Sequence, residues 1–343
     1  MAYYHNLDAL LYFLVTEKWL PGGAIPLQLI KEWEKAYFSN LILNNEIISL
    51  LQRLLEECRL KDIPVIVLKG PAAIAQVYCK NAGVRAMADL DLLCRQKDLQ
   101  PLSDIAFSLG CRRRGLIRLH HLVIAHETLG IYLELHFNLY HFMKNKKPFL
   151  KFVWEKKGRA GLEGVEFPVM PLEAQLAFEV GHFLEHKASV SLKHYLDFAA
   201  KLFLMKGELD WKELERLLRL TGLREEFISF SAALPGLFGL PPEQFFFLAA
   251  PPPVNLDVLT KKRLELSASI GFSDSQGAGA ELARQAGLIK KIIFIFKRLS
   301  PPLAAIQAAY DLPSRSKAFL WIPRHLRETL RDFRERKSTE ATR

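Results

Sequence analysis

The segment Ile63–Cys94, IPVIVLKGPAAIAQVYCKNAGVRAMADLDLLC, decides how the chain folds. Its first part, Pro64–Leu68, is short, β-branched and continuously apolar, which is typical of a buried strand. A Lys-Gly pair follows and leads into a short helix predicted over residues 71–79. A second strand is predicted over Ala88–Cys94, where two aspartates interrupt an apolar run. Charge inside a buried strand usually requires a partner or a function.

The next elements extend this α/β unit. A helix is predicted over Leu99–Leu109, because Gly110 is a typical helix end. His121–Ala125 and Ile131–Phe137 are predicted to form a hairpin, joined through a polar link that contains Gly130.

Helical patterns stand on both sides of this unit. Residues 5–60 have apolar positions at helical spacing, and Pro21-Gly-Gly separates a first helix from a second. After residue 144 the pattern turns helical again, with Leu172–Leu204 as one or two helices and Trp211–Leu220 as another. The Pro-rich passage at residues 241–254 predicts a break or an extended connector.

The predicted fold class is therefore α+β, with a small mixed β-sheet core flanked by helices. Three parts are expected along the chain: an N-terminal helical segment at residues 1–60, the α/β core at 61–143, and a larger helical C-terminal domain at 144–343. With 343 residues the chain is long enough for two or three such units.

Composition and charge narrow the function classes. Hydrophobic residues make up 50% of the chain and charged residues 24%, which excludes disorder over most of its length. The net charge of +10 fits a polyanionic partner such as a nucleoside triphosphate or nucleic acid, and fits simple solubility equally well. The four cysteines lack C-x-x-C spacing and are expected to be reduced thiols of a cytoplasmic protein. Because a membrane span needs roughly 20 uninterrupted apolar residues, none is expected.

The strand Ala88–Cys94 carries the first candidate site residues. Successive side chains of a strand point to opposite faces, so Asp89 and Asp91 share one face. Two neighbouring carboxylates raise each other's proton affinity unless a cation lies between them, and Mg²⁺ is commonly held by one or two carboxylates plus substrate phosphates. For an isolated Asp-x-Asp, a strand edge whose aspartates face water is the favoured alternative.

Three further features favour the metal site. Glu134 and His136 share a face of the predicted strand Ile131–Phe137, and if this strand neighbours the strand of the two aspartates, Glu134 supplies a third carboxylate. Lys69 and Gly70 stand between a strand and a helix, where a close backbone approach, helix-terminal N–H groups and a lysine favour phosphate. Arg85 precedes the aspartate pair and can fork onto a phosphate. Together these groups form the set that two-metal phosphoryl or nucleotidyl transfer requires.

At this point the sequence resembles the uncharacterised nucleotidyltransferases, a minimal bacterial and archaeal branch of the DNA polymerase beta-like superfamily. The resemblance covers about residues 40–245 well and the C-terminal third weakly. Its motifs in the α/β part are Leu68-Lys69-Gly70, Tyr78, Arg85, Met87, Asp89-Leu90-Asp91-Leu92-Leu93 and Glu134-Leu135-His136. In the helical part they are Pro171-Leu-Glu, Gly181-His182, His186, Tyr195-Leu-Asp197 and Asp210-Trp211.

This resemblance implies a polymerase beta-like sheet and transfer of a nucleoside monophosphate from a triphosphate such as ATP, with Mg²⁺ or Mn²⁺. It implies that Asp89, Asp91 and Glu134 bind the metal and that Lys69 and Gly70 meet the triphosphate. The chain departs from the wider superfamily in two places. Lys-Gly stands where a Gly-Ser is usual, and the third carboxylate is a glutamate where an aspartate is commoner.

Other residues leave alternatives open. His182 and His186 share a helical face and can bind zinc, although packing or hydrogen bonding to substrate is favoured. Asp197 either orients substrate or pairs with Lys193 or Arg219. His136 is a further candidate for orienting substrate. The basic clusters at residues 112–118 and 315–337 read as solvated surfaces, with an RNA acceptor less favoured.

The first hypothesis is an enzyme, a Mg²⁺-dependent nucleotidyltransferase acting on an unknown hydroxyl or phosphate acceptor, a small molecule or a protein. The second is a catalytically weak nucleotide-binding or regulatory module of the same fold, in a biosynthetic or toxin–antitoxin-like system. A histidine-ligated metal hydrolase is a third, less favoured hypothesis.

Overall fold

The computed structural model of this chain describes residues 6–117, 120–140, 142–185, 191–238 and 303–310, and the single residues 312, 314, 317, 321 and 323. The Pro-rich passage at 241–254 and nearly all of the basic segment at 315–337 lie outside the described residues.

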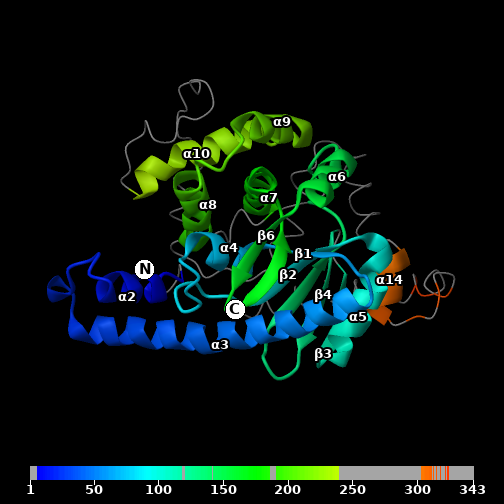
Figure 1. Ribbon diagram of the computed structural model, residues 1–343, viewed down its shortest axis with the longest axis horizontal. Helices are drawn as coiled ribbons and strands as arrows, with labels where there is room; N and C mark the ends of the chain where they lie inside the picture. Colours follow the sequence, from blue (N-terminus) through cyan, green and yellow to red (C-terminus); the bar gives the residue numbers. More distant parts are fainter. Residues whose placement is uncertain are drawn as a thin grey trace, which may run out of the picture. The chain divides into compact units, whose positions relative to one another are not determined.

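The described strands form one seven-stranded sheet in the order β3-β4-β5-β2-β1-β7-β6 (Figure 1). Strands β1 and β7 pair in parallel, whereas β4 pairs with β3 and β5, and β6 with β7, in antiparallel orientation. The predicted α+β class with a mixed sheet is thereby confirmed. The strands are β1 (Val65–Val67), β2 (Asp89–Cys94), β3 (Cys111–Ile117), β4 (His121–His126), β5 (Tyr132–His136), β6 (Gly158–Leu162) and β7 (Val165–Val169).

The predictions for β1, β2 and the β4–β5 hairpin are confirmed, but the prediction that the chain is helical again from residue 144 was wrong at β6 and β7. Strand β6 contains two glycines and β7 contains Pro168, and both residue types weaken a strand signal. The signal lies in the link between the strands. Glu163 and Gly164 have φ of 50° and 78°, the left-handed backbone that a two-residue hairpin turn requires.

Strand β3 was also missed, because its sequence CRRRGLI reads as a basic cluster. It pairs with β4 through an irregular register between Arg113 and Leu116. Such an irregularity interrupts the two-residue alternation on which strand prediction depends.

Two compact units interleave along the chain. The first comprises residues 1–52, 66–90 and 142–272, and the second comprises 53–65, 91–141 and 273–343. Their boundary therefore passes through α3 (Leu27–Leu60), β1 and β2. The predicted division into segments 1–60, 61–143 and 144–343 remains a prediction.

The first unit contains most of the described helices. Helices α7 and α8 pack against each other and against α10, while α7 also contacts α9, and α4 packs on α8 and β6 (Figure 1). Asp210 accepts backbone N–H bonds from Lys212 and Glu213 and so caps α9, which ends at Gly222 with a φ of 71°. The α-helices that lie wholly within this unit are α2 (Asp8–Thr16), α4 (Lys69–Val77), α6 (Lys146–Lys156), α7 (Leu172–Glu185), α8 (Leu192–Leu204), α9 (Trp211–Thr221) and α10 (Arg224–Phe238).

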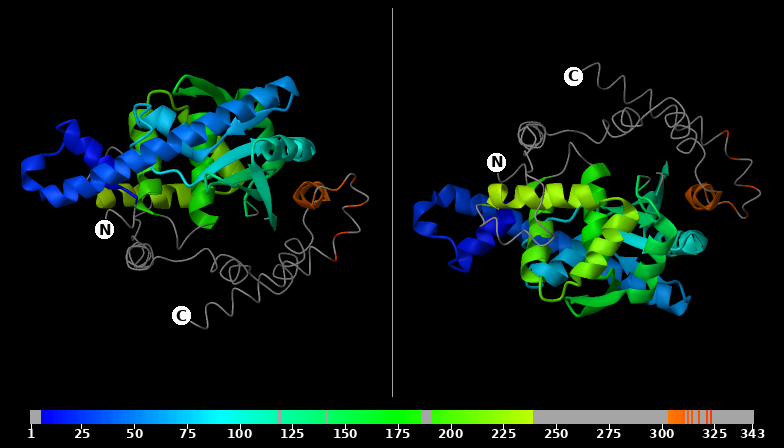
Figure 2. Two further views of the ribbon diagram at one scale, coloured as in Figure 1. Left: turned by 90° about the horizontal axis from the view of Figure 1, so that it is seen from below. Right: turned by 90° about the horizontal axis from the view of Figure 1, so that it is seen from above.

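Helix α2 folds back along the first half of α3 (Figure 2), as the break predicted at Pro21-Gly-Gly requires. The Tyr12 hydroxyl donates to Glu34 at 3.0 Å, and the Tyr12 ring lies 5.3 Å from the Tyr37 ring between centroids. Aromatic and polar contacts therefore join the two helices.

The loop at residues 81–85 is held by side chains of α3. Asn44 Nδ2 donates to the carbonyl oxygens of Ala82 at 2.6 Å and of Arg85 at 2.8 Å. A Cβ atom at Gly83 would lie 2.5 Å from ring atoms of Tyr37, so only glycine fits there without displacing the ring. This packing fixes the backbone from which the Arg85 side chain extends.

The second unit carries strands β3 to β5 and two described helices. Helix α14 (Leu303–Tyr310) packs on β3 and on α5 (Leu99–Ser108). A small apolar cluster joins two residues of α14, Leu303 and Ile306, to Leu312 and Trp321. Among the described residues of the whole chain, no helix is long and apolar enough to cross a membrane.

Candidate functional site

Asp91, Glu134 and His136 come together in the second unit. Asp91 lies on β2, and Glu134 and His136 lie two residues apart on β5, so their side chains share a strand face. His136 Nε2 lies 2.8 Å from Asp91 Oδ1 and 3.5 Å from Glu134 Oε2. Each of the three residues offers a possible ligand atom, and these atoms all lie within 4.8 Å of one another.

The three side chains differ in burial. The side chains of Asp91 and His136 are each 1% exposed, whereas that of Glu134 is 22% exposed. A buried carboxylate requires a donor or a cation, and the Nε2–H group of His136 supplies a donor to Asp91. Glu134 is therefore the member of this acidic group that solvent or substrate reaches most easily.

Asp89 is the first residue of β2, two positions before Asp91, so the two share a face of the strand by alternation. It is half-buried and belongs to the first compact unit. Its part in a metal site remains a prediction.

The donor set of the acidic group fits the predicted cation. Carboxylate oxygens are the protein ligands that Mg²⁺ and Mn²⁺ prefer, and two carboxylates converge here. The hydrogen bond from His136 to Asp91 would orient that carboxylate, as groups bonded to metal ligands commonly do.

The turn between β1 and α4 carries Lys69 and Gly70. Helix α4 begins at Lys69, earlier than predicted. The backbone of Lys69 has a φ of 46°, a left-handed conformation that residues other than glycine rarely adopt. A Cβ atom at Gly70 would lie 2.8 Å from Met87 Sδ, so the glycine permits the close approach of Met87. Contact of either residue with a phosphate remains a prediction.

Arg85 and Asp197 form a buried ion pair in the first unit. Arg85 Nη2 lies 2.7 Å from Asp197 Oδ2, Arg85 Nε contacts both carboxylate oxygens, and the Tyr78 hydroxyl donates to Oδ1 at 2.6 Å. Burial raises the pKa of Asp197, but Arg85 and Tyr78 outweigh it and hold that pKa below its usual value. The ion-pair partner of Asp197 is thus Arg85, whereas the sequence had suggested Lys193 or Arg219.

Lys193 is a third basic residue of the first unit, after Arg85 and Lys69, whose charges act on one another. Its Nζ donates to the Ala86 carbonyl at 3.3 Å. Burial, together with repulsion from Arg85 and Lys69, lowers the pKa of Lys193 to about 8, in spite of attraction from Asp197 and Asp89. A cation held close to other cations is a favourable partner for a polyphosphate.

The remaining predicted site residue, His182, lies on α7 with its ring 5.2 Å from that of His194 between centroids. Burial and Lys193 lower the pKa of His194 to about 3, so its ring is neutral. His194 Nδ1 accepts a hydrogen bond from the Ser191 backbone N–H at 3.2 Å. His186, the other half of the predicted zinc pair, lies outside the described residues.

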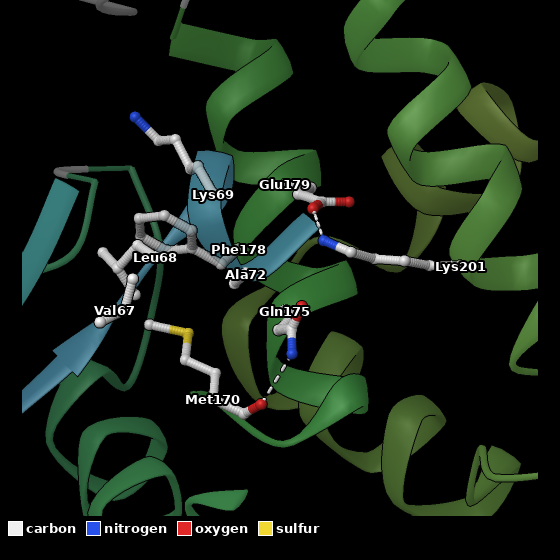
Figure 3. Close-up of a pocket in the computed structure, with 9 residues that line it drawn as sticks. All are labelled: Val67, Leu68, Lys69, Ala72, Met170, Gln175, Phe178, Glu179 and Lys201. Carbon is white, nitrogen blue, oxygen red and sulfur yellow. Dashed lines mark hydrogen bonds and ion pairs between the residues drawn. The ribbon is translucent and has the colours of Figure 1, made fainter. Parts of the chain in front are cut away.

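A small pocket adjoins the turn at Lys69 (Figure 3). Glu179 and Lys201 form a buried ion pair in its wall, and burial raises the pKa of Glu179 above its usual value despite Lys201. Gln175 donates to the Met170 carbonyl at 2.8 Å, and the Lys69 side chain points away from both interactions. The lining is Val67, Leu68, Lys69, Ala72, Met170, Gln175, Phe178, Glu179 and Lys201.

Comparison with protein families decides the identity of the chain. The sequence model of a family described as "Uncharacterised nucleotidyltransferase" matches residues 1–238. The chain belongs to this family. A comparison with curated proteins gives no match.

The solved structures to which this nucleotidyltransferase is similar at low identity include the following three. The solution structure of the antibiotic-resistance factor ANT(2'')-Ia has 15% identity and a TM-score of 0.41, and the match covers 57% of this chain and 98% of that one. The crystal structure of ANT(2'')-Ia with adenylyl-2''-tobramycin has 14% identity, a TM-score of 0.39, and coverage of 53% and 99%. An antigenic nucleotidyltransferase-like protein from Paracoccidioides brasiliensis has 16% identity, a TM-score of 0.35, and coverage of 57% and 98%.

Sequence reasoning about this nucleotidyltransferase missed two features. Lys193 was considered only as a partner of Asp197, although its position four residues earlier on α8 places it on the same helix face. The neighbouring histidines His120 and His121 were given no role, and the position of His121 directly opposite His136 in the predicted hairpin was the available signal.

Proposed function

We propose that this nucleotidyltransferase uses Mg²⁺ or Mn²⁺ to transfer a nucleoside monophosphate from a nucleoside triphosphate to a hydroxyl or phosphate acceptor. The observation that supports it most directly is the convergence of Asp91, Glu134 and His136 from two strands. The proposal assigns the metal to Asp91 and Glu134, with Asp89 as a further ligand. When bound, the ion would offset negative charge on the triphosphate during displacement.

The protein's own groups have separate roles in this proposal. The acceptor oxygen attacks the α-phosphorus, the bond from that phosphorus to the β-phosphate oxygen breaks, and pyrophosphate leaves. Glu134, the most exposed member of the acidic group, has two carboxylate oxygens, so one can take the proton from an acceptor hydroxyl while the other would hold the metal. His136 holds the Asp91 carboxylate in place.

The triphosphate is assigned to the turn at Lys69 and Gly70 and to Lys193. Lys69 and Lys193 each carry an ammonium group, and these positive charges attract a polyanion to this region. The guanidinium fork of Arg85 is held by Asp197, so this buried pair adds no net charge, and contact of Arg85 with a phosphate stays a prediction. The acceptor is a small molecule or a protein, with RNA less favoured.

The proposal is tested first on the unmodified protein. Mg²⁺ with a nucleoside triphosphate is expected to raise the melting temperature, because a ligand that binds the native state stabilises it. Incubation with each of the four α-labelled triphosphates and a cell extract is expected to label an acceptor and release pyrophosphate. A melting curve that no triphosphate changes would contradict both the enzyme and the binding hypothesis.

The second candidate is the catalytically weak nucleotide-binding module. It is favoured by the burial of Asp91, whose side chain is 1% exposed and already bonded to His136. This candidate predicts the same rise in melting temperature without labelled acceptor or pyrophosphate. The two measurements together therefore separate the two functions.

The proposed phosphate contact of Lys193 makes triphosphate binding pH-dependent. Since the pKa of Lys193 is lowered to about 8, its ammonium is largely present at pH 7 and largely lost at pH 9. A bound triphosphate favours the charged form, so affinity is highest below pH 8 and falls as the pH rises through 8. The charged groups near Lys193 are Arg85, Lys69, Asp197 and Asp89.

The expected loss is about 10-fold in Kd between pH 7 and 9, the order of one charge-assisted contact. It is measured by titrating Mg²⁺–triphosphate into the protein at constant ionic strength. Lys193→Arg should bind equally at both values, because a guanidinium stays charged. The exposed Lys212→Arg serves as the control and should keep the unmodified profile. The same pH profile in Lys193→Arg would rule out this role.

A further inference from the structure

Three buried histidines of the second unit form a cluster beside the acidic group. His120, His121 and His136 are 2%, 5% and 1% exposed. Each offers one ring nitrogen, and the three nitrogens lie within 4.8 Å of one another. The ring centroids are 4.5 Å apart for His120 and His121, 4.9 Å for His121 and His136, and 5.6 Å for His120 and His136.

The hairpin explains why these rings meet. His121 and His136 are direct cross-strand partners in the β4–β5 register, so their side chains stand on the same face. His120 precedes β4 at a bend, outside the alternation that would turn its ring to the other face. Its carbonyl accepts hydrogen bonds from the backbone N–H groups of Phe137 at 3.0 Å and Asn138 at 3.2 Å. The chain beyond β5 therefore holds His120 against the strand pair.

We propose that His120, His121 and His136 bind a divalent transition-metal ion of the zinc class, at a site that adjoins the acidic group and shares His136 with it. Three imidazoles with a fourth position for water or a carboxylate are a common zinc ligand set, whereas Mg²⁺ prefers oxygen. Zinc–nitrogen bonds of about 2.0–2.1 Å place tetrahedral ligand nitrogens roughly 3.3 Å apart. The cluster reaches that spacing by closing by no more than roughly 1.5 Å, which small rotations of the rings supply.

Two carboxylates beside the cluster support a metal role. Metal-binding histidines commonly give their second ring N–H to a carboxylate, which fixes the ring orientation. Asp91 Oδ1 lies 2.8 Å from His136 Nε2, a contact of this kind that fixes the orientation of the ring. Glu134 Oε1 lies 3.7 Å from His121 Nε2, so a second carboxylate adjoins the cluster, and the fourth position of the ion is left to water.

His126, on strand β4, is a buried histidine outside the cluster. Its Nδ1 accepts from the Leu129 backbone N–H at 3.3 Å, which leaves Nε2 to donate to the Leu109 carbonyl at 3.1 Å. Both nitrogens of this buried ring are used by the protein's own backbone. His126 is therefore a matched control for the cluster.

The test titrates Zn²⁺ alone into the full-length protein after removal of metals with a chelator. The unmodified protein is expected to bind one equivalent. His120→Asn and His121→Asn are each expected to weaken binding by at least about 100-fold, while His126→Gln should bind like the unmodified protein. Absence of zinc binding in the unmodified protein, or equal binding by the His120 and His121 variants, would overturn the proposal.

Two further measurements are needed. One tests zinc binding without any variant, in case the variants fail to fold, and the other tests whether the ion is bound by the histidines or by the acidic group. A chelator should lower the melting temperature of the unmodified protein and Zn²⁺ should restore it, with X-ray absorption at the zinc edge showing imidazole ligands. Zinc with oxygen ligands alone would contradict the assignment. So would zinc binding that Asp91→Asn abolishes while His120→Asn and His121→Asn retain it. The Zn²⁺ titration and the Mg²⁺–triphosphate measurements are made separately, so failure of this proposal is distinguishable from failure of the proposed function.

Discussion

Asp91→Asn is expected to lower the rate of nucleotidyl transfer by about 10²–10³-fold. A bound metal ion contributes several kcal/mol to the transition state of such a reaction, and each 1.36 kcal/mol corresponds to a factor of ten in rate. Asparagine keeps the shape of the side chain and still accepts the hydrogen bond from His136, so the protein should remain folded. The loss would therefore come from the missing negative charge.

The measurement is pyrophosphate release at saturating triphosphate, with the Mg²⁺-dependent rise in melting temperature measured in parallel. Asp104→Asn removes the same charge from an exposed position on α5 of the same unit and should change neither readout. Glu134→Gln should reduce turnover while leaving the folded state intact, because its side chain is 22% exposed. If Asp91→Asn turns over at the unmodified rate, the metal assignment is wrong.

Asp197→Ala is expected to destabilise the protein by about 3–5 kcal/mol, the range observed when one partner of a buried ion pair is removed. The Arg85 side chain is 7% exposed, and the substitution would leave its guanidinium without the carboxylate that it grips through Nε and Nη2. The Tyr78 hydroxyl would lose its acceptor as well. The free energy of unfolding is measured by denaturant titration.

Two comparison variants identify the cause of this loss. Glu166→Ala breaks an exposed pair with Arg159 and should change the free energy of unfolding by less than about 1 kcal/mol. The double change Arg85→Met with Asp197→Leu removes both buried charges and should recover most of the stability lost in Asp197→Ala. A stable Asp197→Ala protein with lost activity would instead favour the role of orienting substrate.

The sequence predicted the parts of the fold that obey a regular period. Strand β1 is a continuous apolar run, and β4 and β5 stand on either side of a glycine-containing link, so period and turn chemistry agreed. Strands β6 and β7 were missed because glycine and proline stand where β-branched residues are expected. Strand β7 pairs with β1 through Val67 and Val169, residues about a hundred positions apart, and β6 pairs only with β7.

The candidate site was predictable to a similar extent. Alternation along a strand was enough to place Glu134 and His136 on one face, and the motif pointed to Asp91. The partner of Asp197 was not predictable from local spacing, because Arg85 lies 112 residues away and reaches it only after α4, α8 and the loop at 81–85 have packed. The lowered pKa of Lys193 was not predictable either, because it depends on burial and on charges from distant segments.

The left-handed backbone at Lys69 sets two selective pressures against each other. Glycine would adopt a φ of 46° with less strain than any lysine, so the folded state alone favours glycine at this position. The proposed contact with triphosphate favours the ammonium instead. A directed-evolution screen that rewards thermal tolerance alone would therefore drift toward an inactive sequence here, whereas a screen on turnover would preserve the strained residue.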